Sequence, residues 1–425
     1  MSDFFDVEIT TSDEMLQETL RGSADHRLKD IVATIQSEQN KIIRANLEKP
    51  LIVQGVAGSG KTTIALHRIA YLIYTYEKTF KPENFMIIAP NKVFLNYISD
   101  VLPELSVEEA RQTTFAEFCF DLLNIKSKLT RQEEKLTILM DDQKQSEKQR
   151  ELIEWASFFK GSMTFRKLID NYLVQIQREM LPQEDVLLDV FPLMTAQEVE
   201  DNFIYEYAYL PIYKRLEQIK KKLSFRIRHK KKEFIKSVSD DYEQKIKTAR
   251  FSAEDEDEAR QKAVSLMSKR DEILVRIEKA ARNLAASYIK KFKKSDTLSC
   301  YKKLITDPDM LQSYSPEVLD SEKVRYLCKA SETYLKEKKL EPEDLAALLY
   351  LKSKLEGFRD KVTCRYVVID EAQDFSLFQF YVLKHVLDTE NFTILGDLSQ
   401  GIYAYRGVYS WQDVEEQIFL ARRHA

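Results

Sequence analysis

The chain has 425 residues, 44% of them hydrophobic, which is enough apolar side-chain volume for two or three packed domains. Its formal net charge of −4 excludes a globally basic nucleic-acid-binding protein, so any cationic surface must be local. No apolar run reaches the roughly 18 residues that a membrane span needs, and the acidic N-terminus is unlike a signal peptide. The four cysteines form no C-x-x-C pair, which argues against a zinc site or a disulfide framework and suits a reducing cytoplasm.

The glycines are concentrated in two parts of the chain. Six of the nine lie at positions 55, 58 and 60 or at positions 396, 401 and 407, and none occurs between Gly161 and Gly357. Because glycine is unfavourable inside helices, this distribution predicts a middle segment that is mostly helical.

The N-terminal segment gives weak signals. Residues 1–27 are polar and acidic and predict a loosely attached lead-in. From Leu28 onward apolar residues recur at helical spacing, with a helix start at Thr34 or Ser37. Gln39 in this helix could pair its amide with the donor and acceptor edge of adenine, which would select ATP over GTP, or it could be an ordinary surface glutamine.

Residues 55–62 (GVAGSGKT) match the phosphate-binding pattern G-x-x-x-x-G-K-[ST]. They follow a short apolar run that predicts a buried strand, and a helix is expected after them over residues 63–76. The three glycines would let successive backbone N–H groups point at phosphate oxygens. Lys61 would reach the β- and γ-phosphates, and Thr62 would place its hydroxyl on Mg²⁺. The alternative, a chance glycine-rich turn, is disfavoured by the flanking strand and helix.

Strand and helix signals then alternate. Residues 85–89 predict a second buried strand, and residues 91–98 open the next helix. This alternation implies a parallel sheet. Residues 112–115 are expected to begin another helix, with Thr113 or Thr114 as its N-cap.

Two later apolar runs lead into acidic and glycine-containing segments. Residues 366–369 predict a strand that ends at Asp370 and Glu371, and residues 392–395 predict another that leads into residues 396–407. In a P-loop ATPase, Asp370 would hold the Mg²⁺ and Glu371 would orient and deprotonate the attacking water. The alternative is a helix N-terminus whose acids interact with the helix dipole. The phosphate-binding motif upstream favours the catalytic interpretation.

The long segment between the two halves of this site, residues 126–340, is expected to be a helical insertion. Apolar residues recur at spacings of mostly three and four over residues 212–246 and again over residues 266–292. This spacing predicts an antiparallel, coiled-coil-like helical hairpin at about residues 212–293. Its first arm is basic over residues 220–232, which is either a solvated helix face or a surface for RNA, DNA or an acidic protein.

Together these motifs resemble the first motor domain of UvrD/Rep-type superfamily 1 helicases. Within that family they are most similar to the HelD-like proteins, which act on bacterial RNA polymerase. The resemblance covers about residues 1–125 and 340–425 and rests on six matches: Gln39 at the adenine-reading glutamine, residues 55–62 at motif I, Ala89–Lys92 at motif Ia, Thr114–Phe115 at the Thr-Phe step, residues 370–374 at motif II and residues 396–407 at motif III.

The resemblance implies an α/β fold with a RecA-like parallel sheet formed by residues 28–125 and 341–425, and ATP with Mg²⁺ as cofactors. The family moves 3′ to 5′ on DNA. Gln400 matches the glutamine that senses the γ-phosphate, and Tyr405 matches an aromatic residue on which a base of a single strand stacks. The expected catalytic residues are Lys61, Asp370, Glu371 and Gln400. The expected ATP-binding residues are Gln39, Gly55, Gly58, Ser59, Gly60, Lys61, Thr62 and Thr63, with Thr62 and Asp370 on Mg²⁺. The expected nucleic-acid-binding residues are Asn91, Thr114, Phe115, Tyr405 and Arg406.

The sequence departs from the family pattern in three ways. Thr63 stands where the family often has an arginine that lies against adenine. The chain ends at Ala425, soon after motif III, so a second motor domain would have to come from elsewhere, in cis or in trans. The long N-terminal coiled coil of HelD-like proteins has no counterpart. We therefore expect this chain to bind ATP, to hydrolyse it barely above background and not to unwind duplex DNA.

The expected partners are single-stranded DNA, bacterial RNA polymerase or both, in the cytoplasm. A rival interpretation is an interaction module that binds polymerase or nucleic acid through its helical insertion, with a nucleotide site that only regulates it. A third, a small-molecule kinase, is disfavoured because residues 400–407 would have no role there.

Overall fold

The computed structural model describes residues 37–47, 49–76, 80–103, 109–140, 146–252, 255–358, 364–403 and 405–420. The chain forms two compact units, one of residues 1–118 and 362–425 and the other of residues 119–361. The expected lead-in of residues 1–27 and a helix start at Thr34 lie outside the described residues. Residues 37–43 are helical.

The first unit is built on a five-stranded sheet with the order β1-β9-β8-β2-β3. All four pairings of neighbouring strands are parallel. The five strands are β1 (Leu51–Gln54), β2 (Phe85–Ala89), β3 (Arg111–Thr114), β8 (Tyr366–Ile369) and β9 (Phe392–Gly396). Strands from the end of the sequence therefore lie between strands from its beginning, and the expected α/β fold with a parallel sheet is confirmed.

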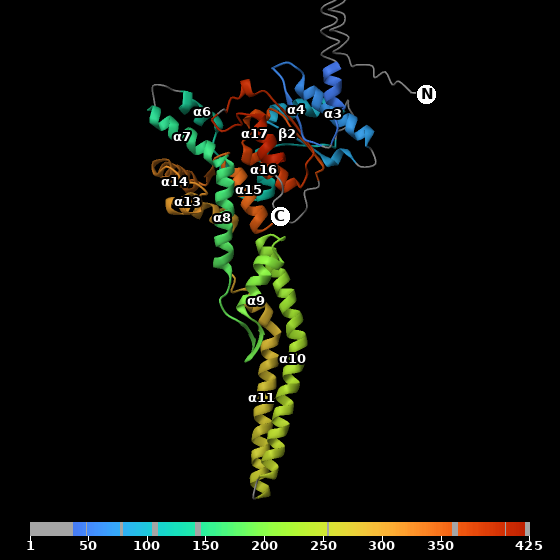
Figure 1. Ribbon diagram of the computed structural model, residues 1–425, viewed down its shortest axis with the longest axis vertical. Coiled ribbons are helices and arrows are strands. Elements are labelled where there is room, and N and C mark those ends of the chain that lie inside the picture. Colours follow the sequence, from blue (N-terminus) through green and yellow to red (C-terminus); the bar gives the residue numbers. More distant parts are fainter. Residues whose placement is uncertain are drawn as a thin grey trace, which may run out of the picture. The chain divides into compact units, whose positions relative to one another are not determined.

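Burial explains which segments become strands. Every residue of β2, β8 and β9 is buried, as expected for apolar runs in a sheet that is covered on both faces. Ile69 on α3 (Lys61–Thr75) and Ile98 on α4 (Lys92–Val101) are fully buried in the core cluster that also contains Ile87. Figure 1 shows α3 and α4 in blue. This unit also contains α16 (Leu377–Leu387) and the shorter helices η1 (Pro82–Asn84), η4 (Ala372–Asp374), η5 (Leu398–Gln400), α17 (Trp411–Val414) and η6 (Glu415–Phe419).

One strand of this sheet was not predicted. The sequence suggested a helix from residue 112, whereas residues 111–114 form β3, which pairs with β2. The helix, α5 (Phe115–Leu123), begins only after it. The hydroxyl of Thr114 accepts a 3.1 Å hydrogen bond from the backbone N–H of Glu117, so the predicted N-cap is confirmed. The sequence of β3, RQTT, has no apolar run because it is an edge strand.

The second unit is mainly helical. Its helices are α6 (Gln132–Met140), α7 (Glu147–Lys160), α8 (Met163–Met180), α9 (Ala196–Asp201), η3 (Asn202–Glu206), α10 (Ile212–Phe251), α11 (Glu256–Ile289), α12 (Thr297–Ile305), α13 (Pro308–Tyr314), α14 (Ser321–Lys336) and α15 (Asp344–Leu355). It also contains two small sheets, the parallel pair β4 (Lys128–Leu129) and β7 (Lys339–Leu340) and the antiparallel pair β5 (Val186–Leu188) and β6 (Phe191–Met194). Among the described residues of the chain, no helix is both long and apolar enough to cross a membrane.

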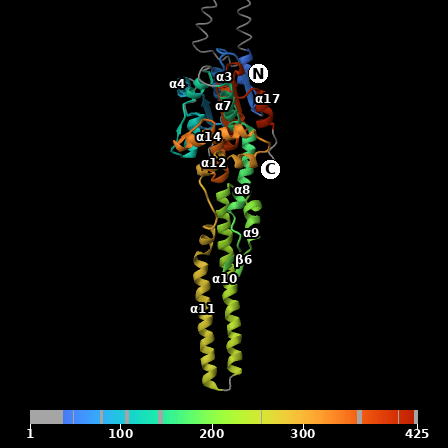
Figure 2. The ribbon, with the colours of Figure 1, turned by 90° about the vertical axis from the view of Figure 1, so that its left-hand side faces the viewer.

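The two longest helices, α10 with 40 residues and α11 with 34, form a hairpin (Figures 1 and 2). They run side by side, and Lys231 on α10 lies 3.6 Å from Glu278 on α11. The buried residues of the first half of α10 recur every three or four positions, which places them along one face of the helix. The apolar ones are Ile212, Leu216, Ile219, Leu223 and Ile227, and Arg215 is buried beside them.

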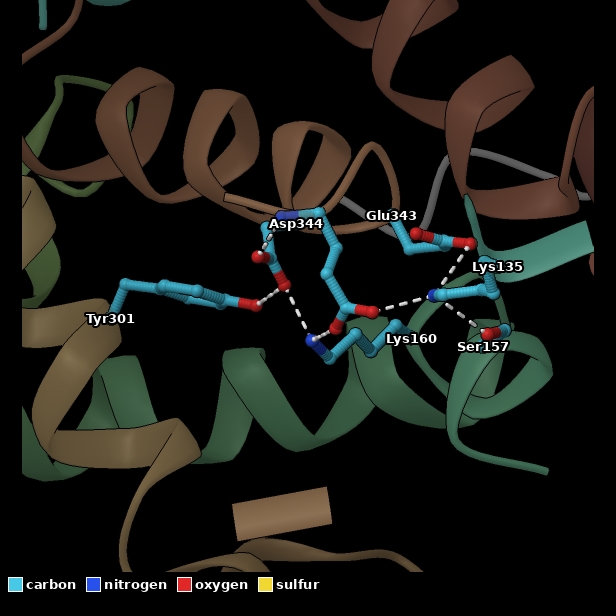
Figure 3. A network of polar contacts seen from close by, with 7 residues as sticks. Lys135, Ser157, Lys160, Tyr301, Glu343 and Asp344 are labelled. Carbon is cyan, nitrogen blue, oxygen red and sulfur yellow. Dashed lines mark hydrogen bonds and ion pairs between the residues drawn. The ribbon is translucent and has the colours of Figure 1, made fainter. Parts of the chain in front are cut away.

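A buried network of charged groups joins the two ends of this unit (Figure 3). Lys160 on α7 donates to Glu341 and Asp344, each at 2.7 Å, and Tyr301 donates to Asp344 at 2.6 Å. Lys135 on α6 contacts Glu341 at 2.5 Å. Burial alone would raise the pKa of Glu341, but the two lysines lower it to about 2. The charges therefore compensate one another inside the unit.

Candidate nucleotide and nucleic-acid site

The loop between β1 and α3 has the backbone conformation of a phosphate-binding loop. Gly58 and Gly60 have φ angles of 76° and 77°, in the left-handed region that favours glycine. A Cβ on Gly55 would lie 2.7 Å from the Ser59 hydroxyl oxygen, so a side chain there would crowd the loop. Because Gly60 directly precedes α3, free N–H groups of the first helical turn border the loop.

Two side chains of this loop place polar atoms at its inner side. Lys61 is 9% exposed, and its Nζ donates to the backbone carbonyls of Gly55 at 2.6 Å and Val56 at 3.2 Å. The hydroxyl of Ser59 is buried without a hydrogen-bond partner among the described residues. A cation and an unsatisfied hydroxyl beside free backbone N–H groups fit a bound polyphosphate.

The carboxylate of Asp370 meets the first turn of α3. Asp370 follows β8 and is 1% exposed, and its Oδ2 accepts a 2.6 Å hydrogen bond from the Thr62 hydroxyl. Burial raises the pKa of Asp370, although the hydrogen bond from Thr62 opposes this shift. Asp370 also accepts a 2.9 Å hydrogen bond at Oδ1 from the backbone N–H of Glu371.

This arrangement fits a magnesium ion that is bound together with a nucleotide. The described residues contain no group of three or more His, Cys, Asp or Glu side chains that could hold a metal by itself. Mg²⁺ in nucleotide sites is usually held by one or two protein oxygens together with phosphate oxygens and water. The adjacent oxygens of Thr62 and Asp370 supply such a pair.

Glu371 is held by a chain of hydrogen bonds that reaches the loop after β9. Its φ angle is 48°, which is uncommon for a residue other than glycine. Its carboxylate accepts a 2.7 Å hydrogen bond from the amide of Gln373. The amide oxygen of Gln373 accepts a 3.0 Å hydrogen bond from the backbone N–H of Asp397. Gln373 therefore links the segment after β8 to the segment after β9.

Asp397 accepts hydrogen bonds from residues of the loop that follows it and from a residue of β1. It accepts from the Gln54 amide at 3.0 Å, from the Ser399 hydroxyl at 2.6 Å and from the Gln400 amide. The indole N–H of Trp411 donates to the Gln54 side-chain oxygen. The exposed Gln400 is thus placed at the same edge of the sheet as the phosphate-binding loop.

Gln39 lies beside the phosphate-binding loop. Its amide nitrogen is 3.7 Å from the position that a Cβ on Gly60 would take, whereas Thr63 is exposed on the first turn of α3. The segment that follows Gln39 is held by Arg68, a fully buried residue on α3. Arg68 donates to the backbone carbonyls of Ile42, Ile43 and Ala45 at 2.7–3.0 Å and to the Tyr366 hydroxyl at 2.8 Å.

The first three residues that the sequence assigned to nucleic-acid binding lie at the carboxyl ends of β2 and β3 or just after them. Asn91 is exposed and caps α4, because its side-chain oxygen accepts a 3.0 Å hydrogen bond from the backbone N–H of Phe94. Thr114 caps α5. Phe115 is buried, with its ring in an edge-on contact with Phe375 at 5.7 Å. Of these three, Asn91 is the most accessible to a strand.

The last two, Tyr405 and Arg406, lie in the loop after β9. Tyr405 is half-buried, and its ring is 6.2 Å from that of Tyr403. Arg406 is 8% exposed, and its guanidinium lies over the ring of Tyr403 at 4.5 Å and that of Tyr405 at 5.9 Å. In this position the Arg406 guanidinium can hold the rings of both tyrosines in place.

The chain matches a known protein family over most of its length. The model of the UvrD/REP helicase N-terminal domain matches residues 35–410. The chain belongs to the UvrD/REP helicase family. The chain is also similar to the ATP-dependent DNA helicase PcrA of two strains of Staphylococcus epidermidis, with 34% identity over 96 residues. That alignment covers 22% of this chain and only 13% of either helicase.

The structure adds residues to this candidate site that the sequence did not single out. Gln54 donates a hydrogen bond to Asp397 and accepts one from Trp411, which lie 343 and 357 residues away from it in the sequence. Arg68 positions the segment of Gln39. The only local signals were that Gln54 directly precedes the phosphate-binding loop and that Trp411 is one of two tryptophans in the chain.

Proposed function

We propose that this chain is the ATP-binding motor unit of a UvrD-type superfamily 1 enzyme, which couples ATP hydrolysis to movement on nucleic acid. The proposal rests mainly on the hydrogen bond between Thr62 and Asp370, since it joins the phosphate-binding loop to the acidic pair after β8. Bound Mg²⁺ would neutralise charge on the β- and γ-phosphates.

The chain's own residues take distinct roles in this proposal. Lys61 binds the phosphates, and Thr62 and Asp370 hold the ion. Glu371 accepts a proton from the attacking water, with Gln373 fixing its carboxylate. Gln400 contacts the γ-phosphate. Asp397 contacts both the Gln400 amide and Gln54, so a shift of Gln400 can reach β1 and the loop that carries Tyr405.

The finer form of the proposal concerns the target. We place the protein in the cytoplasm, where single-stranded DNA, bacterial RNA polymerase or both would be its partners, and where a second motor domain would act in cis or in trans. The similarity to DNA helicases supports DNA, and the HelD-like character of the sequence motifs supports polymerase remodelling. Slow turnover by the 425-residue chain stays a prediction.

Nucleotide binding tests the core of the proposal. Lys61→Ala should abolish Mg²⁺-dependent binding of a fluorescent ATP analogue and leave the circular dichroism spectrum unchanged, because the lost cation contacts phosphate. Lys49→Ala, at an exposed position before β1, is the matched control and should bind normally. Undiminished ATP affinity of Lys61→Ala would refute the site.

Turnover then separates a motor from a regulated interaction module. Steady-state ATP hydrolysis is measured with and without single-stranded DNA and with and without RNA polymerase core enzyme. Stimulation by either partner supports the motor, and the stimulating partner identifies the target. Tight polymerase binding that depends on ATP but never raises turnover would favour the interaction module instead.

A further inference from the structure

The first half of α10 concentrates positive charge on the hairpin. Residues 220–236 contain nine lysines and arginines and one acidic residue. Because Lys231 lies beside Glu278, this segment runs against roughly residues 273–289 of α11. That opposite segment contains three lysines and arginines and one acidic residue, so it does not neutralise the charge.

Four of these cations are compensated by local partners. Lys222 pairs with Glu206 and Arg226 with Glu198, while Lys230 pairs with Glu233 and Lys231 with Glu278. The other five, Lys220, Lys221, Arg228, Lys232 and Lys236, are exposed and form no ion pair with any residue that the structure describes.

Three of these five cations, Lys221, Arg228 and Lys232, share one face of the helix with an exposed aromatic ring. Positions 221, 225, 228 and 232 are spaced by four, three and four residues, so their side chains form a single row about 16 Å long. We call this row (Lys221, Phe225, Arg228 and Lys232) the cationic stripe. The buried face of α10, with Leu223 and Ile227, points to the opposite side.

Phe225 gives the cationic stripe a flat apolar surface between its charges. It is 60% exposed, and the ring of His229 lies beside it with centroids 4.3 Å apart. Phe225 is not among the buried residues of α10. Exposed aromatic rings flanked by cations are what non-sequence-specific single-strand binding surfaces use, with the cations on phosphates and the rings on bases.

We infer that the cationic stripe on α10 is a binding surface for single-stranded nucleic acid. Lys221, Arg228 and Lys232 contact successive backbone phosphates, and a base stacks on Phe225. An acidic protein would match the charges but would leave the ring unexplained, and a duplex would keep its base faces covered. The surface belongs to the unit of residues 119–361, so the inference holds whether or not the proposed ATP site is active.

The test uses the full chain and a fluorescein-labelled single strand, dT or rU of twelve nucleotides, with binding followed by anisotropy. The triple variant Lys221→Gln, Arg228→Gln, Lys232→Gln should bind more weakly. The slope of log affinity against log salt should also flatten by about 2, since each lost phosphate contact on a single strand contributes about 0.7. Phe225→Leu keeps an apolar side chain but removes the ring, and should lower affinity about fivefold or more, whereas Phe225→Tyr should bind normally.

Matched controls separate the cationic stripe from general charge and from the ATPase unit. Lys247→Gln, Arg250→Gln, Arg260→Gln removes three exposed cations elsewhere on the hairpin and should bind normally. All binding measurements are repeated in a Tyr405→Ala background, where the variants of the cationic stripe should still lower the affinity for the strand. ATP binding is measured in parallel and should not change.

Three results would overturn the inference. They are equal losses in the two triple variants, unchanged binding by Phe225→Leu, and displacement of the strand by polyglutamate as efficiently as by unlabelled strand at equal charge. The last result would instead indicate an acidic protein partner.

Discussion

The hydroxyl of Thr62 donates a 2.6 Å hydrogen bond to Oδ2 of Asp370, which lies 308 residues further along the chain. The strand order β1-β9-β8 makes this contact possible, because it brings the carboxyl ends of β1 and β8 to one edge of the sheet. Two oxygens of different chemistry are thereby held beside the phosphate-binding loop.

This pair should behave as one unit in binding. Thr62→Ala and Asp370→Asn should each lower Mg²⁺-dependent ATP affinity by about tenfold or more, and the double variant should lose little beyond the worse single variant, because both residues serve the same ion. Titration of a fluorescent ATP analogue with and without EDTA measures the effect. Thr75→Ala, exposed near the other end of α3, is the control. Fully additive losses would mean that the two residues act independently.

Gln39 should determine the choice of base. Gln39→Ala is expected to lower ATP affinity and leave GTP affinity unchanged, since only adenine presents the edge that an amide reads with one donor and one acceptor. Competition between the two nucleotides for the labelled analogue gives the ratio. Asn40→Ala, exposed on the same helical segment, should keep the preference for ATP. Equal ATP and GTP affinities in the unsubstituted chain would remove this role from Gln39.

Tyr405 should contribute to single-strand binding. Tyr405→Ala is expected to weaken binding by about 1–3 kcal/mol, the usual contribution of one stacked base, with an unchanged melting temperature. Anisotropy with labelled single-stranded DNA and thermal denaturation are the two measurements. Tyr74→Ala on α3 removes an equally large exposed ring and should have no effect on either. A large thermal loss with unchanged binding would show instead that Tyr405 packs the loop.

The buried network of Figure 3 should make Lys160 important for stability. Lys160→Met leaves Glu341 and Asp344 buried without their shared cation, and removing one partner of a buried pair usually costs about 3–5 kcal/mol. Chemical denaturation at pH 7 measures the loss in the free energy of unfolding. Lys167→Met, on the exposed face of α8, should change it by less than about 0.5 kcal/mol.

The effect of Lys160→Met should depend on pH with a defined sign. The pKa of Glu341 is about 2 in the folded chain and near 4.3 in an unfolded one. Its contribution is therefore fully present above about pH 4.3 and is lost as the pH falls toward 2. Lys135, Lys160, Tyr301, Glu343 and Asp344 surround this group. The stability difference between Lys160→Met and the unsubstituted chain should shrink between pH 5 and pH 3, and a constant difference would contradict the assignment.

The sequence predicted the strands that are marked by a local run of apolar residues. Residues 85–89 and 366–369 are apolar runs between turn signals, and both are strands with the predicted bounds. Strand β3 escaped prediction because its sequence is polar and it becomes a strand only by pairing with β2. The motifs indicated Lys61, Thr62 and Asp370. They did not indicate the hydrogen bonds that Gln373, Gln54 and Trp411 make, because those bonds form between segments that lie far apart in the sequence.

The short strands β4 and β7 have a consequence for how this family can diversify. They pair in parallel near the beginning and the end of the unit of residues 119–361, and Lys128 and Thr130 donate to the backbone carbonyls of Lys338 and Leu340. The chain's entry into this unit and its exit are therefore fastened to each other by backbone contacts and by the charges of Lys135, Lys160 and Glu341. The hairpin of α10 and α11 lies between these attachment points and outside the buried network, so it could lengthen, shorten or be exchanged for another module while the attachment points keep their spacing.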